Sequence, residues 1–189
     1  MRTLLVLCIF AVSALTLAGC NSAGKGVEVI IDGGGQFPPS LAGVWRSDEH
    51  GWEFVFEPDG AISSAVVTLG RVRVAPGKTT KVPMLMRGDG IYKPGQWLVA
   101  YSPESKVLTA TIILDRIYIE LGNSLLEGSS RDIFVGEVSE AGDVWVAEWT
   151  SFTKYTAHTP EYPNADLSSD QIEGNSSTLT FTKAAQENN

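Results

Sequence analysis

The chain has 189 residues, a formal net charge of −8 and a hydrophobic fraction of 43%. That fraction is too high for a disordered chain, and the length fits one domain with a substantial core. The acidic balance argues against binding nucleic acid or an anionic lipid surface, because both require cationic patches. We therefore expect one folded domain that has no nucleic-acid partner.

The N-terminal segment has the pattern of an export signal. Arg2 is the only charge before Lys25, and an apolar run extends from Leu4 to Leu17. A basic start, an apolar core and small residues at the end are typical of a cleaved secretory signal peptide. The run is shorter than the roughly 20 residues that a membrane-spanning helix needs.

The end of this segment, Leu17-Ala18-Gly19-Cys20, resembles the lipobox of bacterial lipoproteins. In that family the cysteine thiol receives a diacylglycerol, and the chain is cut immediately before it. The resemblance implies a signal peptide over 1–19, lipidation of Cys20 and attachment to a membrane through its acyl chains. More than one chain is needed for firm anchoring, because a single one binds only marginally.

The residue after the lipobox bears on which membrane the protein is attached to, and the cysteine count bears on the chemistry of the mature domain. In proteobacterial lipoproteins an aspartate after the lipidated cysteine favours the inner membrane, so Asn21 favours the outer membrane of the cell envelope. Cys8 and Cys20 are the only cysteines, and Cys8 leaves with the signal peptide. The mature domain is therefore expected to lack disulfides, although the compartment is oxidising, and to lack cysteine-based catalytic or metal sites.

The composition of the rest of the chain predicts three parts: a tether, a folded domain and a disordered tail. Residues 20–40 are rich in glycine and are predicted to form a flexible tether after the lipidated cysteine. Within them, the β-branched run Val27–Ile31 is either an edge strand or simply extended. The folded domain is expected over 41–183, followed by a disordered tail over 184–189.

From Leu41 onward the sequence alternates short β-type runs with turn signals and shows no helical periodicity. The predicted strands are Trp52–Glu57, Ala61–Leu69, Ile91–Tyr101, Lys106–Leu121, Arg131–Val138, Val144–Phe152 and Thr178–Thr182, with a further short strand at Val82–Met86. The polar stretch 156–177 predicts a long loop. Such a meander favours an all-β fold with a single antiparallel barrel, and a β-sandwich is the alternative.

The longest predicted strand changes its alternation in the middle. Even-numbered positions are apolar from 108 to 114, whereas odd-numbered positions are apolar from 117 to 121. A shift of one residue turns every side chain to the other face, so we predict a β-bulge at Asp115-Arg116. The alternative is two strands that meet in a turn at these residues.

The start of the predicted domain, Leu41 to Trp45, is followed by a strand and polar turn from Glu53 to Gly60. This order resembles the opening of lipocalin-like (calycin) domains, which begin with Gly-x-Trp. The resemblance implies a lipocalin-like barrel in which Trp45 plugs one end. Lys183 is the nearest candidate for the arginine that stacks on this tryptophan in that family.

Few residues are candidates for a functional site. Five tryptophans in one small domain either fill the core or line a cavity, and Trp97, Trp145 and Trp149 are the candidate ligand-binding residues. The candidates for catalysis or metal binding are two carboxylates and two imidazoles, Asp48, Glu49, His50 and His158. Neighbours on an extended chain point to opposite faces and rarely converge, so we expect no metal, no cofactor and no catalytic residue.

These patterns predict a membrane-anchored, non-catalytic envelope lipoprotein that binds a hydrophobic small molecule or a partner protein. One alternative is a periplasmic hydrolase or metal-dependent enzyme that uses the four residues named above. Another is a structural component of envelope assembly whose β edge recruits a second protein.

The lipidation prediction has a direct test in Cys20→Ser. This change removes the thiol that would receive the diacylglycerol, so we expect loss of lipid labelling and accumulation of the unprocessed precursor. Metabolic labelling with a radioactive fatty acid and gel mobility measure both effects. Normal processing of the variant would contradict the lipoprotein assignment.

Overall fold

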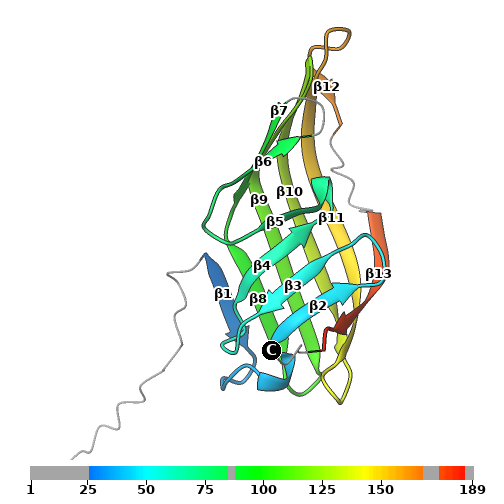
Figure 1. The fold of residues 1–189 in the computed structure, drawn as a ribbon. Coiled ribbons are helices and arrows are strands. Elements are labelled where there is room, and N and C mark those ends of the chain that lie inside the picture. The colour runs from blue at the N-terminus through cyan, green and yellow to red at the C-terminus, as the bar shows by residue number, and fades with distance from the viewer. Residues whose placement is uncertain (1–25, 85–87, 168–174, 186–189) are drawn as a thin grey trace, which may run out of the picture.

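The computed structural model describes residues 26–84, 88–167 and 175–185, and this part of the chain is almost entirely β-structure (Figure 1). The strands are β1 Val27–Ile31, β2 Gly43–Ser47, β3 Glu53–Phe56, β4 Ile62–Val67, β5 Val72–Val74, β6 Thr80–Met84, β7 Gly88–Pro94, β8 Trp97–Ser102, β9 Val107–Leu121, β10 Ser124–Val138, β11 Val144–His158, β12 Ala165–Asp166 and β13 Asn175–Lys183. Two short 3-10 helices are η1 Pro39–Leu41 and η2 Leu69–Arg71. The predicted all-β fold is confirmed, while Cys20 and the signal segment lie outside the described residues.

The strands form one sheet in the order β1-β8-β9-β10-β11-β13-β2-β3-β4-β5, with β6 and β7 attached through β9 and with β12 on β11. Neighbouring strands are antiparallel except for β1, which runs parallel to β8. The sheet curls so that β2 to β4 lie in front of the long strands β9 and β10 (Figure 1). No helix in the described ranges is long and apolar enough to cross a membrane.

The expected closure of the sheet into a barrel is not observed. Among the described strands the hydrogen-bonded order ends at β1 on one side and at β5 on the other. One continuous hydrogen-bonded sheet runs from β1 to β5, so the described strands do not form a sandwich of two separate sheets. The parallel strand β1 occupies the free edge of β8, which a closing strand would need.

The core lies on the concave face of the curled sheet. The largest fully buried side chains are mostly aromatic and comprise Trp45, Trp52, Trp97, Trp145, Tyr92, Phe54, Phe56, Phe134 and Phe181, together with Ile62, Leu108 and Ile112. Ring pairs join strands that are distant in sequence, such as Phe54 with Phe134 at 5.0 Å between centroids. Such pairs add about 0.5–1.5 kcal/mol each beyond the area that they bury. The alternation of Trp52, Phe54 and Phe56 with Glu53, Val55 and Glu57 in the sequence predicts this inward face, and burial of the three rings confirms it.

Strand β2, which carries the Gly-x-Trp sequence, is connected by side-chain hydrogen bonds and strand pairing to the segment before it and to β13. Trp45 is fully buried, and its indole N–H donates to the carbonyl of Leu41 at 2.8 Å. Lys183 is its cross-strand partner on β13, and the Lys183 ammonium donates to the carbonyl of Ser40 at 2.6 Å. The side chain of Lys183 also fills the space where Gly43 would carry a Cβ atom. Trp45 is thus a core residue whose indole donor is satisfied.

The predicted β-bulge is confirmed, and the alternative of two strands meeting in a turn is wrong. Strand β9 is continuous, but its pairing with β10 shifts between Gly128 and Ser130, opposite Asp115 and Arg116. Its pairing with β7 shifts at the same point. Asp115 and Arg116 are exposed, and the buried positions change from even to odd across them. The irregularity therefore keeps apolar side chains inward in both halves of the strand.

The predicted tether and the domain start at Leu41 are wrong for residues 26–40. Val27–Ile31 forms strand β1, and Val27 is fully buried. Phe37 is also buried, with its ring 6.0 Å from that of Phe56 and 6.1 Å from that of Tyr101. Val29 and Ile31 are partly buried against the same core, whereas Ile30 is exposed. The folded domain therefore includes the residues from Val27 onward.

Other boundaries differ where tertiary pairing outweighs local propensity. The predicted strand Ile91–Tyr101 is two strands, β7 and β8, which are separated at residues 95–96. Strands β10 and β11 extend to Ser124 and to His158, because each finds a partner along its whole length. The sequence did not predict β2 or β5. Part of the predicted loop over 156–177 lies outside the described residues, and part of it forms the ends of β11 and β12.

The role of residues 26–40 is tested by Phe37→Ala. Truncation of a buried phenylalanine typically costs 3–5 kcal/mol, so we expect a loss of about that size in the free energy of unfolding. Urea denaturation of the full chain measures it. The control is Gln36→Ala, which changes an exposed neighbour and should alter stability by less than about 0.5 kcal/mol. Equal stability of the two variants would restore the tether interpretation.

Candidate ligand-binding site

A cleft of about 350 Å³ opens on the concave side of the sheet, between the long strands β9 to β11 and the end of β4 with η2. Its walls combine aromatic, aliphatic and hydroxyl side chains with one carboxylate. The lining residues are Trp52, Val67, Thr68, Leu69, Leu114, Ser130, Asp132, Trp149, Ser151, Thr153 and Tyr155. We call this the Asp132 cleft.

The antiparallel register of β10 and β11 brings the polar residues together. Asp132 lies opposite Ser151, and Ser130 lies opposite Thr153. Because side chains alternate between the two faces of a strand, Ser130 and Asp132 share the inward face with Phe134. The inward side chains of β10 therefore change from apolar to polar at Asp132.

Asp132 is a buried carboxylate that is held by neutral donors. Only 5% of the residue is exposed, and the Trp149 indole N–H donates to its Oδ1 at 3.1 Å. Burial raises the pKa of Asp132, although hydrogen bonds with Ser151, Trp149 and Ser130 act in the opposite direction. No lysine, arginine or histidine is among the described residues that line the cleft. The carboxylate thus lacks a cationic partner in the lining.

Two other polar groups near Asp132 are affected by burial. Burial and the nearby Asp132 charge raise the pKa of Tyr155 to about 12, so its hydroxyl stays protonated at neutral pH. Trp52 is 1% exposed, and its indole N–H has no hydrogen-bond partner. A buried donor without a partner costs about 1–3 kcal/mol. The cleft therefore combines an uncompensated carboxylate with an unused donor.

The three tryptophans predicted to bind a ligand occupy different environments. Trp149 lines the Asp132 cleft. Trp97 and Trp145 are fully buried and do not line it; their indole N–H groups donate to the carbonyls of Ile113 at 3.0 Å and Gly136 at 3.2 Å. The structure thus brings only Trp149 to the cleft and gives the other two the packing contacts of core residues.

Sequence reasoning missed most of the cleft. In the sequence, Gly128-Ser129-Ser130 lacks the Gly-x-Ser-x-Gly motif of a nucleophile elbow, and Asp132 and Glu137 fall on opposite faces of their strand, so neither pattern predicts a site. One signal was present, because Asp132 has the same parity as Phe134 and therefore belongs to the inward face of its strand. The other lining residues come from segments that only the curl of the sheet brings together.

The residues proposed for catalysis or metal binding lie elsewhere. Asp48 accepts hydrogen bonds from the backbone N–H of Thr180 and of Glu49, and these bonds lower its pKa. His50 is partly exposed, with its ring 4.9 Å from the ring of Trp149. His158 contacts the carbonyl oxygen of Pro163 through Nδ1. Within the described ranges, no three His, Cys, Asp or Glu residues form a group that could hold a metal.

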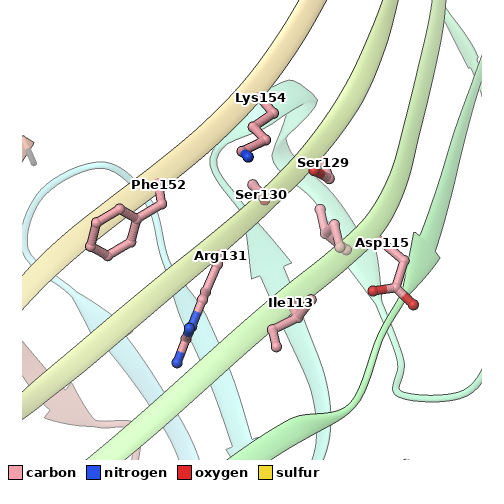
Figure 2. A pocket seen from close by; sticks show the side chains of 8 residues that line it. Ile113, Asp115, Ser129, Ser130, Arg131, Phe152 and Lys154 are labelled. Carbon is pink, nitrogen blue, oxygen red and sulfur yellow. The ribbon is translucent and has the colours of Figure 1, made fainter. Parts of the chain in front are cut away.

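A second groove of about 450 Å³ lies at the bulge. Figure 2 shows Ile113, Arg131 and Phe152, which come from three adjacent strands, and Lys154 further along β11. Arg131 and Lys154 are exposed. None of the buried polar atoms found without a partner in the described residues belongs to this groove. The Asp132 cleft is therefore the stronger candidate for a built binding site.

No protein-family model, curated protein or solved structure matches this chain. The function is therefore argued from the geometry of the cleft and from the sequence pattern of the N-terminus.

The charge of Asp132 should make stability depend on pH. Below the ordinary aspartate pKa of 3.8 the carboxyl is protonated in both the folded and the unfolded chain, so burial has no ionic cost. As pH rises above that value, the unfolded chain ionises first, and the fold loses stability until its own raised pKa is passed. We expect the free energy of unfolding of Asp132→Asn, which is neutral at every pH, to increase relative to that of wild type as the pH rises through this window.

Urea denaturation of the full chain at a series of pH values measures this difference. The control is Glu137→Gln, an exposed acidic position on the same strand, which should show no comparable change. If the advantage of Asp132→Asn shrank as the pH increased, the assigned direction of the pKa shift would be wrong.

Proposed function

We propose that this chain is a lipid-anchored protein of the bacterial cell envelope whose β domain binds a small molecule without chemically altering it. The lipobox-like sequence that ends at Cys20 supports the anchor, and Asn21 favours the outer membrane. The volume of the Asp132 cleft, about 350 Å³, supports the binding role, because small-molecule sites measure roughly 300–1,000 Å³.

The observation that carries the binding role is a buried carboxylate without a counter-charge in the wall of a cleft, together with a lining residue, Trp52, whose indole N–H has no partner among the described residues. Folded proteins pair nearly all of their buried polar atoms, because a buried group without a partner destabilises the fold. Here the Trp52 N–H has no partner, and the Asp132 carboxylate has no counter-charge in the lining. A ligand that bonds to either group would recover that free energy on binding.

The chemistry of the lining favours binding over catalysis. The hydroxyls of Ser130 and Ser151 bond to Asp132, and no imidazole lines the described walls to activate either one as a nucleophile. The Asp132 carboxylate is itself held by three hydrogen bonds, which fix it in place. These contacts support a rigid recognition site.

We also propose a lipocalin-like relationship for the domain, which rests on the position of Trp45. This tryptophan follows Gly43 on an early strand, is fully buried and lies opposite Lys183 of the last strand. The open order of the sheet departs from the closed lipocalin barrel. The proposed binding role does not depend on this relationship.

Blocking the cleft tests the proposed function. Ser151→Leu puts an aliphatic side chain into the cleft, whereas Thr150→Leu makes the same kind of change on the opposite face of β11. We expect wild type and Thr150→Leu, purified as full chains in detergent, to retain a small molecule, and Ser151→Leu to lose at least nine-tenths of it (~10-fold, or about 1.4 kcal/mol). Extraction and mass spectrometry measure the retained molecule.

The full chain is needed, because a shortened chain that starts at Leu41 would lack β1 and Phe37. If wild type retained no molecule, or if Ser151→Leu retained as much as wild type, the proposal would be wrong.

A further inference from the structure

We propose that the ligand of the Asp132 cleft is a small organic cation, an ammonium compound that carries one hydrogen-bond acceptor. This inference rests on the proposed function, since it names the class of molecule that the cleft would bind. It replaces the neutral hydrophobic ligand that the sequence suggested. The charge, the aromatic walls and the unused donor of the cleft support it.

Asp132 has no counter-charge in the cleft. The groups that face it come from β9, β10, β11, the residue before β3, the end of β4 and η2, and all of them are neutral at pH 7. The only other titratable group among them is Tyr155, whose high pKa keeps its hydroxyl protonated. A buried ion is stabilised most by an opposite charge at close range. A cationic ligand would supply that charge, whereas an apolar ligand would desolvate Asp132 further.

Aromatic side chains form part of the wall of the cleft. The rings of Trp52 and Trp149 lie 5.8 Å apart at an interplanar angle of 70°, and Tyr155 belongs to the same lining. The faces of aromatic rings carry negative electrostatic potential and attract ammonium groups. A carboxylate beside two indole rings therefore suits an organic cation, which has both charge and apolar surface.

The Trp52 donor adds a second requirement on the ligand. Its buried indole N–H has no partner among the residues that the structure describes, and an acceptor atom on the ligand would satisfy it. An ammonium group cannot accept a hydrogen bond, so the same ligand needs a hydroxyl, ether or carbonyl oxygen. The cleft volume of about 350 Å³ limits the ligand to a compact molecule. The net charge of −8 also raises the local concentration of cations around the protein.

Matched pairs of probes test the charge requirement. The first pair is choline and its uncharged carbon isostere dimethylbutanol, and the second is tyramine and its uncharged carbon isostere para-propylphenol; both members of each pair carry a hydroxyl acceptor. Each probe is titrated against the full chain in detergent by calorimetry, with the indole N–H resonances followed by NMR. We expect at least one cation to bind at least tenfold more tightly than its neutral partner and to shift the resonances of Trp52 and Trp149.

Two variants test whether the preference for the cation over its neutral isostere depends on Asp132. Asp132→Asn should remove the tenfold preference, whereas the control Glu137→Gln should keep it. Affinity for the cation should also fall at low pH, since protonation of Asp132 removes the charge that the cation pairs with. The comparison of the two probes in wild type needs no variant and stands even if Asp132→Asn does not fold.

The possible failures point to different conclusions. Equal affinity for the cation and its isostere in both pairs overturns the cation assignment, and so does a preference that survives in Asp132→Asn. The assignment is likewise overturned if neither cation binds wild type. In each case the proposed function still stands if wild type retains a molecule that Ser151→Leu loses. Absence of any retained molecule would overturn the proposed function itself.

Discussion

The packing of aromatic rings across the concave face is the interaction on which the fold depends. Phe54 on β3 contacts Phe134 on β10 and Phe181 on β13, with ring centroids 5.0 and 5.3 Å apart. Trp145 on β11 lies 4.8 Å from Phe181 and closes the cluster. All four rings are fully buried. The only cysteines are Cys8 and Cys20, so burial of such rings, rather than a disulfide, holds the two sides of the curled sheet together.

The same cluster determines where the binding cleft can form. Phe134 stacks on Trp149 at 6.2 Å, and Trp149 in turn donates its N–H to Asp132. Beyond this point the inward side chains of β10 and β11 are polar or small, and the facing strand β4 ends. The indole ring of Trp149 therefore contacts both the aromatic core and the carboxylate of the cleft. A carboxylate at the boundary is tolerated because three neutral hydrogen bonds support it.

The placement of β1 bears on the proposed anchor. Six residues separate Cys20 from Val27, the first residue of β1. A chain of that length spans at most about 25 Å when fully extended. If Cys20 is lipidated, the folded domain lies close to the membrane surface rather than at the end of a long tether.

The sequence by itself determined the all-β class, the inward face of β3 and the bulge at Asp115-Arg116. Each of these follows from alternation or from local spacing, which short segments carry without knowledge of their partners. The prediction of a tether over residues 26–40 rested on their glycine-rich composition, which is typical of a linker. The pairing of β1 with β8 is what makes this segment part of the folded domain.

Only the tertiary structure decided the order of the sheet, its failure to close and the composition of the Asp132 cleft. Trp52, Leu69, Asp132 and Tyr155 are separated by long stretches of chain and meet because the sheet curls around an aromatic core. Pairing over such distances depends on the energies of many contacts at once, and no local pattern encodes it. The burial that raises the pKa of Asp132 and isolates the Trp52 N–H is likewise a property of the assembled fold.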